Sequence, residues 1–190
     1  MKMASFYSEN ELVNIGFKCY GKNVCISKLC SIHNAKNISL GSNIRIDDFC
    51  VISAGEKGLK IGNYVHIAIF SSIIGAGEVV MDDFSCISSR VAIYSSNDDY
   101  SGEYLTNPLV PNNFRNVQNG DVYIGRHVVV GSGSVLLPNI KLEQGAAIGA
   151  LSLVSKDCEE FSIYAGVPAV KIKNRKRNIL DKEKQFFCLS

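Results

Sequence analysis

A large apolar residue recurs at every sixth position along most of this chain, and this period limits the fold more than any other feature. A period of six matches neither the roughly 3.6-residue repeat of a helix nor the alternation of an isolated strand, but it suits short strands joined by tight turns. The spacing resumes at Ile124 after an interruption and continues to Val154. The repeating positions before the interruption are Tyr20, Ile26, Ile32, Leu40, Ile46, Ile52, Ile61, Ile67, Ile73, Met81, Ile87 and Ile93.

Three short strands and three turns make one triangular coil of a prism. Stacking the coils at about 4.8 Å pairs each strand with those above and below it and points one aliphatic side chain per edge inward. Polar pairs such as Ser42-Asn43 and Asp82-Asp83 stand where the corners need turn geometry. An open β-sandwich would instead show turn signals spaced by roughly 8–12 residues. The sequence therefore predicts an all-β fold, a parallel β-solenoid of about six triangular coils.

Segments at both ends and in the middle of the chain depart from the repeat. Ser8 and Glu11 have the spacing of a capping box, which predicts a short helix that covers the exposed edge of the first coil. The polar loop in the middle has a length typical of functional or of disordered segments. A terminal helix is expected around residues 179–187. We expect one domain, 1–190, with an N-terminal cap at 1–17, a β-helix at 18–157 that ejects the loop 95–121, and a C-terminal extension at 158–190.

The end of the repeat carries the most specific motif of the chain. Residues 154–157 read Val-Ser-Lys-Asp and residues 165–169 read Ala-Gly-Val-Pro-Ala, after repeated Ile-Gly units and one long loop. This combination resembles the hexapeptide-repeat acyltransferases, especially the sugar O- and N-acetyltransferases of bacterial surface-polysaccharide biosynthesis. The resemblance implies a left-handed parallel β-helix and a homotrimer. The hand comes from the resemblance alone, because parallel crossover connections are otherwise right-handed.

The resemblance also implies acetyl-CoA as co-substrate, held in a groove between neighbouring prisms. Small residues let such a molecule approach the backbone closely, and exposed amides at the corners can bind its amide arm. On their own, small residues also suit the corners of any solenoid, and a basic tail is often only solvated. By their match to family positions, the expected cofactor-binding residues are Ser132, Ala150, Ser155, Lys156 and Lys173. No metal is expected.

The catalytic residues cannot be transferred from the family, because the loop differs at its decisive position. Where the sugar and maltose acetyltransferases carry a catalytic histidine, this chain has Asp98. His66 lies between the inward Val65 and Ile67, so strand alternation points its imidazole outward. With a reference pKa of about 6.5, a histidine can take a proton near neutral pH. His66 is therefore the first candidate for a general base, and a solvated surface histidine is the alternative.

The loop supplies the second group of candidates. Asp98 and Asp99 together can orient His66 or bind a protonated amine, although paired Asx residues more often cap turns. Asp98 is therefore the second catalytic candidate. Asn97, Asp99 and Tyr100 are the expected substrate-binding residues. The other two histidines fall on other edges or corners and are interpreted as structural or solvated: His33 and His127.

The expected activity is acetyl transfer from acetyl-CoA to a sugar, either a saccharide hydroxyl or a nucleotide-linked amine, in lipopolysaccharide or O-antigen biosynthesis. The sequence reveals no Cys-His arrangement among the seven cysteines, so we expect direct transfer with a general base and no acyl-enzyme. Two alternatives from other classes use the same fold. A zinc hydratase of the γ-type carbonic anhydrase kind needs three histidines together. A non-catalytic prism scaffold needs none of the candidate residues.

Composition excludes other classes of partner. The chain has 20 Lys and Arg against 18 Asp and Glu, so a net charge of +2 gives no broad positive field for nucleic acid. No run approaches the roughly 18 apolar residues of a membrane span, and the first ten residues lack the apolar stretch of a signal peptide. The odd number of cysteines predicts reduced thiols rather than a disulfide framework. We expect a cytoplasmic protein.

Overall fold

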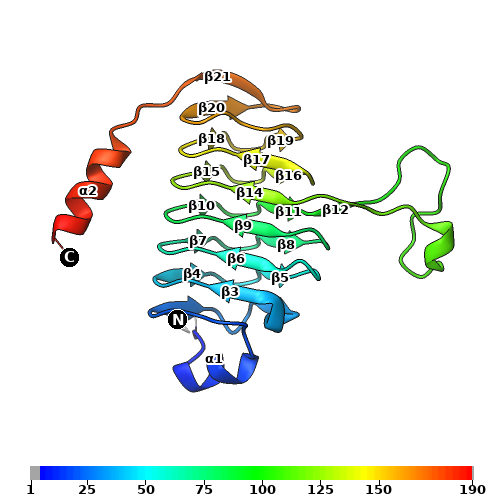
Figure 1. The fold of residues 1–190 in the computed structure, drawn as a ribbon, viewed down its shortest axis with the longest axis horizontal. Coiled ribbons are helices and arrows are strands. Elements are labelled where there is room, and N and C mark those ends of the chain that lie inside the picture. Colours follow the sequence, from blue (N-terminus) through cyan, green and yellow to red (C-terminus); the bar gives the residue numbers. More distant parts are fainter. Residues whose placement is uncertain (1–4, 190) are drawn as a thin grey trace.

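The repeat folds into a parallel β-solenoid whose coils stack along one axis (Figure 1). The structure is a computed structural model that describes residues 5–189. The first four residues of the expected cap and the last residue of the C-terminal extension lie outside the described residues. Strands of successive coils pair in parallel, as the period of six predicted.

The coils contribute strands to three faces, which we number in chain order. The first face holds β1 (Val24–Ile26), β4 (Ile44–Ile46), β7 (His66–Ile67), β10 (Cys86–Ile87), β15 (Val129–Val130), β18 (Ala147–Ile148), β20 (Ser162–Ala165) and β21 (Val170–Asn174). The second face holds β2 (Ser31–His33), β5 (Val51–Ser53), β8 (Ser72–Ile74), β11 (Ala92–Tyr94), β16 (Val135–Leu136) and β19 (Leu153–Val154). The third face holds β3 (Ile38–Leu40), β6 (Leu59–Ile61), β9 (Val79–Met81), β14 (Val122–Ile124) and β17 (Ile140–Leu142).

The predicted repeat positions form the core of the prism. Burying one such aliphatic side chain stabilises the fold by about 1.5–3 kcal/mol, so a full column of them outweighs any single polar contact. Tyr20 is an exception to the prediction and is 36% exposed. The segment before β1 pairs with the first coil through the bridge of Cys19 to Ser39 and through the amides of Lys18 and Gly21, so Tyr20 lies in the outermost layer of the prism. The fully buried side chains include Ile26, Ile46, Ile52, Ile67, Ile73, Ile87, Ile93 and Ile124.

The prism has one more coil than the six expected. The sheet of the first face has eight strands, and because only β21 runs antiparallel, seven coils are stacked. The additional layer is β20, which pairs in parallel with β18 and carries the solenoid beyond residue 157, where the sequence placed its end. The aliphatic pattern stops at Val154 because Cys158 and Tyr164 fill the next buried positions.

The corner between the third and first faces uses the left-handed backbone region in every coil. Six of its residues have φ between 44° and 60° without being glycine, the seventh is Gly145 at 71°, and most stack on their counterparts in adjacent coils. The Asn23 side chain donates a hydrogen bond of 2.9 Å to Asn43. The rings of Tyr64 and Phe84 are parallel with centroids 4.8 Å apart. Stacking of this kind offsets the roughly 1–2 kcal/mol that the left-handed conformation costs. The column is Asn23, Asn43, Tyr64, Phe84, His127, Gly145 and Phe161.

Two α-helices flank the prism (Figure 1). The helix α1 (Glu9–Ile15) begins with the predicted capping box between Ser8 and Glu11 and buries Leu12 against the first coil. The helix α2 (Ile179–Leu189) lies where the terminal helix was expected and runs beside the prism. Within residues 5–189, no helix is both long enough and apolar enough to cross a membrane. Two short 3-10 turns complete the helices: η1 (Ala35–Asn37) and η2 (Asn112–Phe114).

The long loop leaves the prism after β11 and returns at β14 (Figure 1). At its base β12 (Ser96–Asn97) pairs antiparallel with β13 (Gln118–Asn119), which makes a short ribbon. The rest of the loop projects away from the coils. The prism is undisturbed by this excursion, because Ile87 pairs with Val130 in the same register as Ile67 pairs with Ile87.

Candidate functional site

The first face carries the predicted base in a column of outward side chains. His66 lies on β7, and its neighbours in the column are Arg45 of β4 and Cys86 of β10. The alternation of the repeat points His66 outward as predicted, and its side chain is 42% exposed. The buried Val65 and Ile67 on either side fix the strand, so the imidazole is presented from a rigid element.

Asp47 holds the imidazole in place. It follows β4, and its Oδ2 lies 2.8 Å from Nε2 of His66. Its Oδ1 accepts a hydrogen bond of 2.7 Å from Nε of Arg45. The Asp47 side chain is only 20% exposed, so the carboxylate is fixed between two cationic or proton-donating groups. Asp47, rather than Asp98 or Asp99 of the loop, is the carboxylate that orients His66.

The electrostatics of the pair set its protonation state. Burial alone raises the pKa of Asp47, but hydrogen bonds from His66 and Arg45 outweigh burial and hold that pKa below its ordinary value. An ionised carboxylate only accepts hydrogen bonds, so the neutral imidazole carries its proton on Nε2. The lone pair of Nδ1 is then free to take a proton. The contacts with Cys86 and Asp47 raise the pKa of His66, against the opposing effect of partial burial.

Cys86 completes this cluster, and the sequence analysis missed it. Its Sγ lies 4.0 Å from Nδ1 of His66, on the side of the ring away from Asp47. The sequence revealed no Cys-His arrangement, whereas the structure brings these two side chains together. The signal that could have identified Cys86 is the coil length, because His66 and Cys86 are strand partners one coil apart. Spacing of that kind becomes readable only after the register of the coils is known.

The loop candidates lie away from this cluster, at the edge of the second face. Asp98 and Tyr100 are exposed, and Tyr100 is 85% exposed. The Asp99 carboxylate accepts hydrogen bonds from the Ser101 hydroxyl and the Gly102 amide, which is the turn-capping role that paired Asx residues often have. Asn97 belongs to the ribbon at the loop base. The catalytic role of Asp98 stays a prediction.

The expected cofactor residues occupy two corners of the last coils and the final strand. Ser132 and Ala150 stack on the corner after the first face, where the Leu151 amide donates 2.9 Å to the Ser132 carbonyl. Both are exposed. Gly131 lies so close to Ala150 that a Cβ on it would be 2.5 Å from the Ala150 amide nitrogen. The small side chains of this corner therefore leave the backbone accessible to a ligand.

Ser155 and Lys156 follow β19 at the next corner, and Lys173 lies on β21. All three are exposed. Ser155 lines a groove of about 400 Å³ together with Asn97 and Gln118 from the base of the loop. The structure thus brings a predicted cofactor residue and a predicted substrate residue to one groove.

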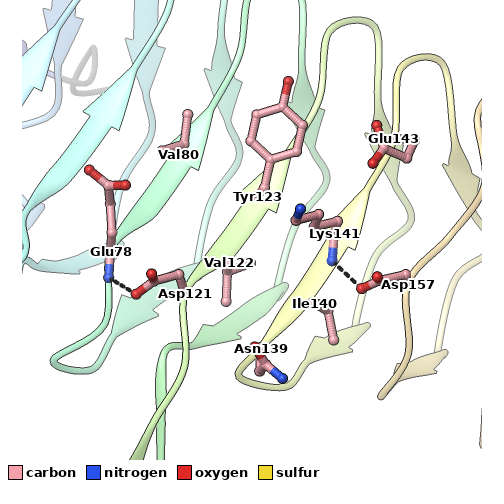
Figure 2. A pocket seen from close by; sticks show the side chains of 10 residues that line it. All are labelled: Glu78, Val80, Asp121, Val122, Tyr123, Asn139, Ile140, Lys141, Glu143 and Asp157. Atoms are coloured by element: carbon pink, nitrogen blue, oxygen red, sulfur yellow. Dashed lines mark hydrogen bonds between the residues drawn. The ribbon is translucent and has the colours of Figure 1, made fainter.

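A larger cleft, of about 510 Å³, lies on the third face (Figure 2). Two of its carboxylates accept hydrogen bonds from the backbone: Asp121 accepts one of 2.9 Å from the Glu78 amide, and Asp157 accepts one of 2.8 Å from the Lys141 amide. These bonds tie successive coils together. Because His66 belongs to another face, this cleft is not the candidate catalytic site.

The three histidines do not meet. His33 lies on the second face, His66 on the first, and His127 at the corner where its buried ring contacts Glu183 of α2. His127 is thus structural, as one of the two expected readings had it. Within residues 5–189, no group of three His, Cys, Asp or Glu side chains is placed to hold a metal ion. The zinc-hydratase alternative therefore has no ligand set in this part of the chain.

Sequence comparison decides the family. The chain is 51% identical over 182 residues to the dTDP-4-amino-4,6-dideoxy-D-glucose acyltransferase of Escherichia coli. The matched region covers 96% of this chain and 95% of that protein. This chain belongs to the hexapeptide-repeat acyltransferases. This chain is also 29% identical over 163 residues to WbbJ of Escherichia coli K12, which is named for O-acetyl transfer in lipopolysaccharide biosynthesis. That match covers 84% of this chain and 77% of WbbJ. No protein-family model matches this chain.

The fold of this acyltransferase has a close counterpart among solved structures. A variant of AntD, an N-acyltransferase from Bacillus cereus, superposes with a TM-score of 0.95 at 44% identity, covering 100% of both chains. That structure contains dTDP-4-amino-4,6-dideoxyglucose and coenzyme A. Another AntD structure contains dTDP and 3-hydroxybutyryl-CoA. The match confirms the left-handed β-helix that the sequence motifs implied.

Proposed function

We propose that this acyltransferase moves the acyl group of an acyl-CoA, acetyl-CoA first, to the amino group of a dTDP-4-amino-4,6-dideoxy sugar. The observation that carries the proposal is the similarity over the whole chain to AntD, which has been solved with such a sugar and coenzyme A. The Escherichia coli relative, at 51% identity, is named for the same class of substrate. Because a nucleotide-linked sugar is a glycosyl donor, we place the product in lipopolysaccharide or O-antigen biosynthesis, which the similarity to WbbJ supports.

In this proposal His66 is the general base. The amine attacks the thioester carbonyl, the new C–N bond forms, and the C–S bond of the acyl-CoA breaks. Nδ1 of His66 takes the proton from the amine and returns it to the departing thiolate of CoA. Asp47 contributes by holding Nε2 protonated and by stabilising the imidazolium.

The negative charge on the carbonyl oxygen needs donors from outside the strands. The backbone amides beside the cluster are occupied: that of Cys86 donates 2.9 Å to Val128, and that of Ser88 donates 2.9 Å to Val130. The parallel pairing of strands in successive coils uses the backbone amides of the first face as hydrogen-bond donors in the same way. We therefore assign oxyanion stabilisation to corner amides or to a second copy of the chain.

The groove for the acyl-CoA follows the corner of Ser132 and Ala150. The coil of Ala150 lies three layers from that of His66, roughly 14 Å at about 4.8 Å per layer, so an extended arm along this corner reaches the cluster. Lys156 and Lys173 are exposed near the same end of the prism and suit the phosphates. Asn97, Asp99 and Tyr100 on the loop are the proposed acceptor-binding residues.

A homotrimer completes the proposal. The projecting loop exposes large apolar side chains, among them Leu109 at 90% exposure. Ile74 and Tyr94 are also partly exposed side by side on the second face, where β8 pairs with β11. A neighbouring prism can cover such surfaces, because a cyclic trimer repeats one heterologous contact in every copy.

The direct test is turnover. Purified protein is mixed with acetyl-CoA and dTDP-4-amino-4,6-dideoxyglucose, and the N-acetylated nucleotide sugar and free CoA are measured by mass spectrometry. Free hexoses, UDP-linked amino sugars and longer acyl-CoAs serve as comparison substrates. Formation of equal amounts of amide and CoA with the dTDP sugar supports the proposal. Acetylation of sugar hydroxyls alone, or of no substrate at all as a scaffold requires, would contradict it.

A further inference from the structure

A thiol, an imidazole and a carboxylate stand in series on the first face. Cys86 Sγ is 4.0 Å from Nδ1 of His66, and Asp47 Oδ2 is 2.8 Å from Nε2 of the same ring. The three groups come from consecutive coils, since β4 pairs with β7 and β7 with β10. Asp47 and Cys86 therefore contact opposite nitrogens of one imidazole.

This is the arrangement of an activated nucleophile, in which a base lies beside the nucleophile and a third residue orients the base. Asp47 keeps the Nε2 proton in place, so the lone pair of Nδ1 is directed toward the thiol. Arg45 in turn fixes Asp47 through a hydrogen bond of 2.7 Å. The half-exposed imidazole leaves the cluster open to a ligand on the first face.

The other cysteines of residues 5–189 lack this environment. Burial raises the pKa of the Cys30 and Cys158 thiols to about 12, and it also raises the pKa of Cys50. Such thiols are protonated and inaccessible near neutral pH. Cys25 is exposed on the same face as Cys86, but its strand partner is Arg45 rather than a histidine. Cys25 is therefore a matched control for Cys86.

We propose that Cys86 is a nucleophile that accepts the acyl group of acyl-CoA, which gives this acyltransferase a thioester-exchange activity beside direct transfer. The inference rests on the proposed function, because it takes acyl-CoA as the ligand of this face. His66 Nδ1 removes the thiol proton, and Sγ attacks the thioester carbonyl. The Sγ–C bond forms, the C–S bond of acyl-CoA breaks, and CoA leaves as a thiol after receiving the proton from His66.

The exchange replaces one thioester by another, so it needs no oxidant, reductant or further reactant. The acyl group on Cys86 then has two fates. An amino sugar attacks it to form the amide and restore the thiol. Without an acceptor, water hydrolyses it to the free carboxylic acid, so the enzyme acts as a slow acyl-CoA hydrolase. Both fates use the base that the direct route uses.

The experiment measures acylation of the whole protein without an acceptor. The protein is kept reduced with a non-thiol reductant and mixed with acetyl-CoA, and intact-protein and peptide mass spectrometry locate any added acetyl group. The expected result is one acetyl group on Cys86 in the wild type and in Cys25→Ala, and none in Cys86→Ala or Cys86→Ser. In His66→Asn, the rate of acylation should fall by about 10²-fold or more. Circular dichroism confirms that each variant is folded.

The outcomes separate this inference from the proposed function. Normal transfer to dTDP-4-amino-4,6-dideoxyglucose with no acetyl group on Cys86 overturns the inference and leaves the proposed function standing. Acetylation that Cys25→Ala abolishes, or that is spread over several cysteines and unaffected by His66→Asn, also overturns it. Absence of both acylation and transfer overturns the inference together with the proposed function. Acylation confined to Cys86 and dependent on His66 supports it.

Discussion

Glu183 of α2 and His127 of the solenoid corner lie 2.6 Å apart between Oε2 and Nε2, and the His127 side chain is only 3% exposed. The other oxygen of Glu183 contacts the Arg126 guanidinium. The ring of Phe84 stacks on His127 with centroids 5.2 Å apart, and Phe186 packs edge-on against Phe84. A carboxylate and the aromatic rings beside it thus attach the terminal helix to the prism.

We predict that Glu183→Gln destabilises this attachment. Loss of the charge leaves Arg126 and His127 with weaker partners, at a cost of about 2 kcal/mol. For a chain of this size the melting temperature should fall by roughly 4–8 °C. The control is Asp181→Asn on the same helix, whose partner Lys184 is 4.0 Å away and largely exposed. Equal melting temperatures for wild type and Glu183→Gln would contradict the prediction.

The same carboxylate predicts an acid limit. Hydrogen bonding to Arg126 lowers the pKa of Glu183, with partial burial opposing and His127 adding to the effect. A lowered folded-state pKa contributes stability above the ordinary value near 4.3, and that contribution is lost as the pH falls through the folded value. The difference in melting temperature between wild type and Glu183→Gln should therefore shrink below about pH 4. Scanning calorimetry from pH 3 to 7 measures it.

Replacement of the proposed base should remove turnover without removing the fold. We expect His66→Asn to lower kcat by about 10²-fold or more while acetyl-CoA still binds. Because the pKa of His66 is raised and the base must be neutral, the wild-type rate should fall as the pH drops through a value above about 6.5. Measuring the pH–rate profile with acceptors of different amine pKa separates the titration of His66 from the titration of the substrate amine. If His66→Asn is active and Asp98→Asn is not, the base belongs to the loop.

Asp47 is predicted to act through His66 rather than on the substrate. Cys86 and Asp47 both raise the pKa of His66, and Asp47→Asn removes the second contribution, so the acid limb of the rate should move to lower pH. We expect kcat to fall by roughly tenfold with KM for acetyl-CoA nearly unchanged. Asp48→Asn removes the neighbouring carboxylate and is the control. A limb that stays at the wild-type pH in Asp47→Asn would argue against this role.

A bulky substitution tests whether the corner of Ser132 and Ala150 binds acetyl-CoA. Acetyl-CoA should raise the melting temperature of the wild type, since a ligand of the native state stabilises it by mass action. Ala150→Trp should abolish that rise and leave the melting temperature without ligand nearly unchanged, because Ala150 is exposed. Leu29→Trp, on the corresponding corner of the first coil, should keep the full rise. An undiminished rise in Ala150→Trp would remove this corner from the groove.

The loop is predicted to bind a second copy of the chain. Light scattering should give the mass of three 20.7 kDa chains for the wild type. Leu109→Asp places a charge on the most exposed apolar position of the loop and should shift the mass toward one chain. Leu189→Asp, equally exposed at the end of α2, should leave the trimer intact. A wild-type mass near that of one chain would end the trimer proposal.

The sequence predicted what repeats and missed what depends on contact between coils. The inward isoleucines are readable because every coil needs an apolar side chain at the same position. The last coil was not predicted, because Cys158 and Tyr164 take the place of aliphatic residues in its core. His66 was found from alternation alone, but Asp47 and Cys86 reach it from neighbouring coils. Those contacts depend on coil lengths that vary, so the sequence could name the candidate base and not its partners.

The uninterrupted pairing of Ile87 with Val130 means that the loop and the prism are under separate constraints. Doubling the length of a flexible loop costs only about 0.6 kcal/mol in closure entropy, so insertions between β12 and β13 leave the coils intact. Under the proposed function the loop binds the acceptor, so a lineage can exchange this segment and its acceptor while the proposed base and its partners stay unchanged. The same freedom makes the loop the place to graft a new sugar specificity onto a preserved catalytic face.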